Sequence, residues 1–186
     1  MDYKSERDIV IGCQQKQHKA QTAFYNMYKG RLLGVCRRYC RTLAEAEDIF
    51  QDAFVKIFLK IETIQKIESI GGWVKSIVVN TATDHYRKNL KGNGLTEITG
   101  HDFVIEDEEI DFEYIEREQL LEIISSMPAG YRMVVNMYFI DGYKHQEIAE
   151  MLGISESTSK SQLFHAKAWL KEKINRKEKF KVLVAV

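Results

Sequence analysis

A single proline, Pro128, interrupts this chain of 186 residues, and only 11 glycines accompany it. Proline ends helices and glycine weakens them, so a chain with so few of both can form long helices. Hydrophobic residues make up 45% of the sequence and charged residues 29%, which is typical of a globular protein rather than a disordered one. We therefore predict an all-α fold, of a length that suits one compact domain or two small helical ones.

The net charge of zero hides a strongly polarised chain. Residues 1–92 carry 16 Lys and Arg against 10 Asp and Glu, and residues 120–186 carry 10 against 7. Between these blocks, residues 93–119 carry ten acidic residues and one basic residue, Arg117. Such charge runs are often no more than solvated loops. The alternative is that both basic blocks meet phosphate, while the acidic tether meets a cationic surface or keeps the blocks off other polyanions.

The clearest local signals of the first block lie around Leu43. Thr42 and Glu45, three residues apart, have the spacing of a capping box and predict a helix that starts here. Glu45, Asp48 and Asp52 recur at spacings of three and four, so they would share one acidic row of this helix. Such a row favours a basic partner surface.

The rest of the first block is predicted to be helical around one loop. Apolar spacing indicates a helix over 5–40, with a break near His18. We expect a loop over 62–72, ended by two glycines, and a further helix over 73–91. The residues of that last helix expected to face inward are Val74, Ile77, Val78, Ala82 and His85.

The second block is predicted to follow a flexible acidic linker over 93–118, which has little apolar periodicity. Pro128 suits the entry to a helix. The apolar tail, residues 179–186, would dock as a strand or fray. Helices are expected over 120–127, 131–140, 145–152 and 157–175.

Residues 143–158 carry the pattern of a helix-turn-helix. Ala149 permits close approach of two helices, Gly153 suits the tight turn between them, and Ser155 can cap the second helix. Residues expected to bury the angle are Ile148, Leu152 and Ile154. The second helix would pack inward through Leu163, Ala166, Leu170 and Ile174. It would present Thr158, Lys160, Ser161, Gln162 and His165 outward, where short polar groups and a lysine can contact phosphates and base edges.

The sequence offers little for catalysis. It contains neither the phosphate-cradling G-x-x-x-x-G-K-[ST] pattern nor the zinc pattern H-E-x-x-H. Cys36 and Cys40, four apart on a helix, are interpreted as packing residues rather than metal ligands, so we expect no catalytic site, no metal and no cofactor. The polar start is unlike a secretory signal, and three cysteines without framework spacing indicate reduced thiols in a cytosolic protein.

Taken in order, these features resemble a known family. The stretches 44–58, 72–88, 127–135 and the helix-turn-helix resemble the bacterial RNA polymerase sigma factors of the sigma-70 family, in the extracytoplasmic-function (ECF) group. The resemblance implies a factor that binds core RNA polymerase, directs it to specific promoters and helps open the −10 element. It assigns 1–92 to sigma region 2, 119–178 to sigma region 4, which reads the −35 element, and the linker between them to polymerase channels.

The resemblance also implies a set of site residues. The core-polymerase-binding residues would be Asp48, Gln51, Asp52, Phe54 and Val55. The −10 DNA-binding residues would be Trp73, Lys75, Ser76, Asn80, Arg87 and Lys88, beside a loop at 62–72 that holds a base flipped out of the strand. The −35 DNA-binding residues would be Arg132, Thr158, Lys160, Ser161, Phe164 and His165.

Two departures from the family and two alternatives remain. Ser159 stands where an apolar residue is usual, which predicts looser packing of the recognition helix. Gln162 and His165 replace frequent arginines, which predicts a shallower salt dependence of binding by this domain. A stand-alone helix-turn-helix regulator is the main alternative, although it needs neither two blocks nor an acidic row, and an enzyme or helical scaffold is the other. The expected partners are core RNA polymerase, promoter DNA and an anti-sigma factor, in the bacterial cytoplasm.

Overall fold

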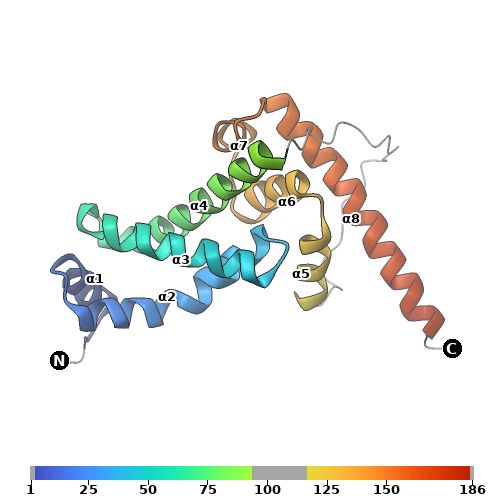
Figure 1. Cartoon of the computed structure of the whole chain (residues 1–186). Coiled ribbons are helices and arrows are strands. Elements are labelled where there is room, and N and C mark those ends of the chain that lie inside the picture. Colours follow the sequence, from blue (N-terminus) through green and yellow to red (C-terminus); the bar gives the residue numbers. More distant parts are fainter. Residues whose placement is uncertain (1–2, 94–116, 185–186) are drawn as a thin grey trace. The chain divides into compact units, whose positions relative to one another are not determined.

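The computed structural model describes residues 3–93 and 117–184, and it gives side chains for 3–90 and 120–174 (Figure 1). Every regular element in these ranges is helical, as the sequence predicts. The chain divides into two compact units, residues 1–85 and 86–186, and each is described by itself. The linker predicted over 93–118 lies almost entirely outside the described residues.

The first unit begins with α1 (Glu6–Gln14) and α2 (His18–Tyr39), so the predicted break near His18 is confirmed. The backbone reverses through Lys16, whose φ of 58° is in the left-handed region. The two helices approach closely at Gly12, because a Cβ added there would lie 2.6 Å from the Cβ of Ala20. Glycine at this position therefore permits the tight α1–α2 contact.

Helix α3 (Leu43–Lys60) begins with the predicted capping box. The Thr42 hydroxyl accepts from the Glu45 amide at 3.2 Å, and the Glu45 carboxylate accepts from the Thr42 amide at 3.3 Å. These bonds satisfy two groups that a helix start would otherwise leave unpaired. Aromatic rings of α3 pack on α2, with Phe50 centred 5.9 Å from Tyr25 and Phe58 centred 6.0 Å from Phe24.

The predicted loop at 62–72 is partly wrong. Two short 3-10 turns, η1 (Ile61–Thr63) and η2 (Ile67–Ser69), follow α3, and α4 (Ile70–Asn93) then begins before the two glycines. Gly71 and Gly72 thus lie in its first turn, where the modest helix penalty of glycine is outweighed by burial of Ile70 and Val74. Ile77, Val78 and Ala82 are buried as predicted.

Besides the end of α4, the described part of the second unit contains four α-helices and one π-helical turn. Helix α5 (Arg117–Ser126) leads to Pro128, which caps the start of α6 (Ala129–Val135). The helix predicted over 131–140 is instead divided, because residues Asn136–Ile140 form the π-helical turn η3. Helices α7 (His145–Leu152) and α8 (Glu156–Val184) follow, so the chain is helical through part of the predicted tail.

Cys36 and Cys40 are buried, as their predicted packing role requires, and Cys13 is buried as well. None of the three forms a disulfide within the described chain. Burial raises the pKa of the Cys13 thiol to about 11 and that of Cys36 to about 12, so neither is a ready thiolate at neutral pH. In the described ranges, no helix has the length and apolar character needed to cross a bilayer.

Candidate functional site

An exposed face of α3 carries most of the predicted polymerase-binding residues. Asp48, Gln51, Asp52 and Val55 all lie on the surface, with Val55 59% exposed. Leu59, four residues beyond Val55, extends the same face and is 75% exposed. We call these five residues the α3 face. Leu59 was not among the predicted residues, although its spacing of four from Val55 is the signal that could have identified it.

Phe54 is placed differently from the other predicted residues of this set. Its side chain is only 5% exposed, and its ring centre lies 4.9 Å from that of Tyr25 on α2. Aromatic pairs at such separations are favourable beyond their buried area. Phe54 therefore supports the α3 face from below and does not itself lie on the surface.

Polar side chains connect the α3 face to α4. The carboxylate of Asp52 lies 2.8 Å from Nε2 of His85, and the Lys56 ammonium lies 3.4 Å from Asp84 and 3.2 Å from the Thr81 hydroxyl. The prediction that His85 faces the core is wrong, because its ring is half-buried and reaches across to the acidic face of α3.

One surface of α4 brings together part of the predicted −10 set. Trp73, Ser76, Asn80 and Arg87 are separated by three, four and seven residues, so they follow one face of the helix, whereas Lys75 and Lys88 are rotated away from it. Trp73 is half-buried, and the Ser76 hydroxyl donates to the Trp73 carbonyl at 2.8 Å. Of the predicted −10 residues, Asn80, Arg87 and Lys88 are exposed.

The helix-turn-helix is present as predicted. Gly153 has a φ of 72°, the left-handed conformation that favours glycine, and it ends α7. The Ser155 hydroxyl accepts from the Thr158 amide at 3.0 Å and so caps α8. Ile148 and Leu152 are buried as predicted, together with Ala149, whereas Ile154 is only half-buried. The residues predicted to pack α8 inward are also buried: Leu163, Ala166, Leu170 and Ile174.

The predicted −35 residues of α8 are only partly exposed. Lys160, Ser161 and Phe164 lie on the surface, whereas Thr158 and His165 are half-buried. The Lys160 ammonium lies 2.7 Å from the Glu156 carboxylate, and this contact lowers the pKa of Glu156. The surface therefore offers one lysine, one hydroxyl and one aromatic ring near the start of α8.

Two residues expected at the DNA surface are buried instead. Gln162 is 7% exposed, so the prediction that it points outward is wrong. Arg132, 6% exposed, donates from Nη1 to the carbonyls of Ser125 at 2.8 Å and Met127 at 3.0 Å. Both carbonyls lie at the end of α5, where a helix leaves acceptors unpaired, so the guanidinium satisfies the α5–α6 connection rather than a surface.

The looser packing expected at Ser159 is also wrong. Ser159 is fully buried, and its hydroxyl lies 2.9 Å from Nδ1 of His145 on α7. The His145 ring stacks on Tyr138 of η3, with ring centres 4.7 Å apart. A hydrogen bond between the two helices thus replaces an apolar contact. Burial and the nearby Lys160 lower the pKa of His145, although Glu156 opposes this.

No cluster of metal-ligating side chains occurs among the residues whose placement is given.

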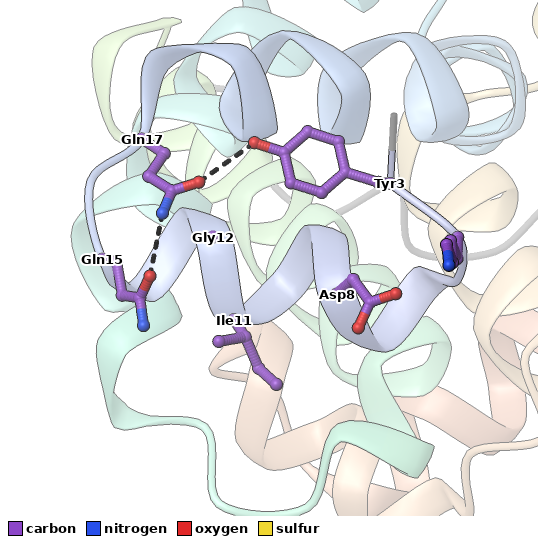
Figure 2. Close-up of a pocket in the computed structure, with 7 residues that line it drawn as sticks. Tyr3, Asp8, Ile11, Gly12, Gln15 and Gln17 are labelled. Atoms are coloured by element: carbon purple, nitrogen blue, oxygen red, sulfur yellow. Dashed lines mark hydrogen bonds between the residues drawn. The ribbon is translucent and has the colours of Figure 1, made fainter. Parts of the chain in front are cut away.

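A hollow of about 330 Å³ lies along α1, where Tyr3, Asp8, Gly12, Gln15 and Gln17 line it (Figure 2). It contains none of the predicted site residues. In Figure 2 the Tyr3 hydroxyl reaches Gln17 at 3.1 Å, and Gln17 donates to Gln15 at 2.9 Å.

Comparison with known proteins assigns both halves of the chain to models of one family. A model described as "Sigma-70 region 2" matches residues 24–91, and one described as "Sigma-70, region 4" matches residues 117–170. The first match runs from within α2 to near the end of α4 and leaves out α1. The second covers α5 to α7 and the first half of α8.

Several curated proteins are similar over most of the chain. "RNA polymerase sigma factor SigV" of Bacillus subtilis is 29% identical over 69% of this chain and 75% of that protein. "ECF RNA polymerase sigma-E factor" of Escherichia coli is 22% identical over 91% of this chain and 94% of that protein. "Probable RNA polymerase sigma factor RfaY" of Xanthomonas campestris is 27% identical over 89% of this chain, which spans only 42% of that longer protein.

Proposed function

The chain belongs to the sigma-70 family of bacterial RNA polymerase sigma factors, in its ECF group, and we propose that it binds core RNA polymerase and directs transcription initiation at specific promoters. The observation that carries this proposal is the match of regions 2 and 4, in that order, to two separate helical units. A stand-alone regulator would need the helix-turn-helix but not region 2. The main alternative is therefore set aside.

We assign polymerase binding to the α3 face. The carboxylates of Asp48 and Asp52 are exposed to solvent beside the exposed apolar side chains of Val55 and Leu59. Acidic groups around apolar ones suit a partner surface that is basic at its rim and apolar at its centre. Phe54 contributes by fixing α3 on α2.

DNA contacts are assigned to three surfaces. The exposed residues of the loop after α3, together with Trp73, Asn80 and Arg87 of α4, would hold the opened −10 strand through stacking, hydrogen bonds and phosphate contact. Lys75, Ser76 and Lys88 remain predicted contacts beside them. In the second unit, Thr158, Lys160, Ser161, Phe164 and His165 would enter the −35 major groove from α8. We leave Arg132 out of this set, since it is buried.

The direct test measures binding of the purified full chain to bacterial core RNA polymerase and run-off transcription over a promoter library. We expect a complex at moderate salt and transcripts that depend on the added chain. Asp48→Lys should weaken the complex about tenfold, because it places a cation against a basic surface. Glu47→Lys makes the same charge change four residues before Gln51, at the edge of the α3 face, and should weaken the complex less. Absence of any complex would overturn the proposal.

Further properties follow from the same proposal. Sigma factors are non-enzymatic initiation factors, so we propose that this chain has no catalytic activity of its own, and no cofactor or metal. It would act in the bacterial cytoplasm. An anti-sigma factor that covers the α3 face or the start of α8 is proposed as its regulator. Such a partner would compete with core polymerase, which titration of the complex can measure.

A further inference from the structure

Helix α1 contacts the loop that we assign to −10 recognition. The side-chain amide of Gln14 donates from Nε2 to the carbonyl of Ile61 at 3.3 Å and to that of Ile64 at 3.0 Å. Both carbonyls lie where α3 ends and the loop begins, a place where a helix leaves acceptors unpaired. One partly buried side chain from α1 thus bonds two backbone groups some fifty residues away, of which the Ile61 carbonyl also accepts from the Ile64 amide at 3.3 Å.

Two ion pairs join the same elements farther along the loop. Lys16 lies 3.1 Å from Glu62 of η1, and Arg7 lies 3.0 Å from Glu68 of η2. All four side chains are largely exposed, so each pair contributes little by itself. Together with Gln14 they show that α1 runs beside the loop from its first turn to its second. Gln14 is the least exposed of these groups, so its bonds are the least screened by water.

The loop has fixed ends and an exposed middle. Ile61 and Ile64 are buried, whereas Gln65 and Lys66 point to solvent. The Ser69 hydroxyl donates to the Lys66 carbonyl at 2.8 Å and closes the second turn. A loop that captures an extruded base must present its backbone in one conformation, because ordering it on binding would reduce affinity. The contacts that hold the ends of the loop therefore determine how precisely the backbone at Gln65 and Lys66 is positioned.

We propose that Gln14 of α1 is a positioning residue for the −10 element, which fixes the base-capturing loop through the carbonyls of Ile61 and Ile64. This rests on the function proposed above for the loop. Helix α1 lies outside the part of the chain that matches region 2, which begins at residue 24. The determinants of −10 selectivity thus extend to an element beyond the matched region.

The test uses Gln14→Met, which keeps the length of the side chain and removes its donor. Full-length wild type and variant, each bound to core polymerase, are titrated with single-stranded oligonucleotides of the −10 element and of each single-base change in it. We expect about a fivefold loss for the preferred sequence, the factor expected for one net hydrogen bond. The ratio of the affinity for the preferred base to the affinities for the other three, at the position of the captured base, should also decrease.

Gln15→Met is the matched control. Gln15 is the next residue, is exposed, and bonds Gln17 on the side of α1 shown in Figure 2. The Gln15→Met variant loses the same side-chain amide, and we expect it to keep the wild-type affinity and the wild-type ratio of affinities among the four bases. If Gln14→Met lowers the melting temperature, Gln14→Asn replaces it: its amide sits one methylene short of the carbonyls, and we expect the same loss of discrimination.

The outcomes separate the two proposals. Wild type that binds polymerase and discriminates among bases, with Gln14→Met equal to it, would overturn the role of Gln14 and leave the proposed function intact. A uniform loss for all oligonucleotides, with the base ratio unchanged, would also overturn it, because that is what general destabilisation produces. Wild type that shows no preference for any base would overturn the assignment of the loop itself.

Discussion

The two units use buried polar groups in different ways. In the first unit, the hydroxyls of the buried Thr81 and Thr83 donate to carbonyls of their own helix, each at 2.8 Å. Bonds between elements of this unit come from partly exposed side chains, such as Gln14 and Lys56, which donates to the Thr81 hydroxyl. In the second, Arg132 joins α6 to the end of α5, and Ser159 joins α8 to α7. A core held by apolar contacts tolerates small shifts, whereas hydrogen bonds between elements fix their angle and are costly to leave unmade. Helix α8, which we propose reads DNA, is thus oriented by buried polar contacts, while the α3 face rests on aromatic packing.

The largest expected effect is at Arg132. Arg132→Met removes a charged donor and leaves the carbonyls of Ser125 and Met127 unpaired, so it should destabilise the second unit by about 3 kcal/mol. Chemical denaturation followed by the fluorescence of Trp169, in a Trp73→Phe background, measures this unit. Lys160→Met, also a cation replaced by Met but on the surface, should change its stability by less than about 0.5 kcal/mol. Equal losses of stability in the two variants would contradict the comparison, because they would show that the buried bonds of Arg132 stabilise the unit no more than a surface lysine does.

A smaller effect is expected at the contact between α7 and α8. Ser159→Ala leaves Nδ1 of His145 without its partner and should cost about 1.5 kcal/mol, the upper range for one neutral hydrogen bond. Binding of the −35 element by the full chain should weaken too, because the start of α8 loses its fixed angle to α7. Ser161→Ala, two residues on and exposed, makes the same substitution and should not change stability. A stable Ser159→Ala protein with unchanged unfolding would show that apolar packing alone holds the helix.

The same contrast explains how far the sequence could be interpreted. The capping box at Thr42 and the turn at Gly153 were predictable because each is a local motif whose partners lie within four residues. The burial of Arg132 was not, because polar residue type predicts exposure and only the folded structure shows which acceptors are close enough to permit burial. The contact of Gln14 with Ile61 and Ile64 spans 47 and 50 residues, and no periodicity within one helix encodes it.

In the first unit, the capping box gives the next largest effect. Thr42→Ala removes the acceptor for the Glu45 amide and should cost about 1 kcal/mol, the usual value for loss of an N-cap. Trp73 fluorescence in a Trp169→Phe background can follow this unit alone. Because the cap is exposed and the aromatic packing beneath α3 remains, polymerase binding should be nearly unchanged. If Thr42→Ala cost as much as Arg132→Met, the first unit would depend on its polar contacts as strongly as the second, and the comparison would fail.

The smallest expected effect concerns pH and is confined to the second unit. Burial, and then repulsion from Lys160, lower the pKa of His145 below its ordinary value of 6.5. The unfolded chain therefore takes up a proton at a higher pH than the folded one, so the contribution of His145 to stability is complete above pH 6.5 and is lost as the pH falls through the lowered pKa. The Trp169 transition should show a larger loss of stability between pH 7.5 and 5.5 for wild type than for His145→Gln, which cannot take up the proton. His18→Gln, an exposed change in the first unit, should follow wild type. An identical pH dependence of wild type and His145→Gln would mean that the bond to Ser159 does not respond to protonation of His145. The contact between α7 and α8 would then stabilise the second unit equally at pH 7.5 and pH 5.5.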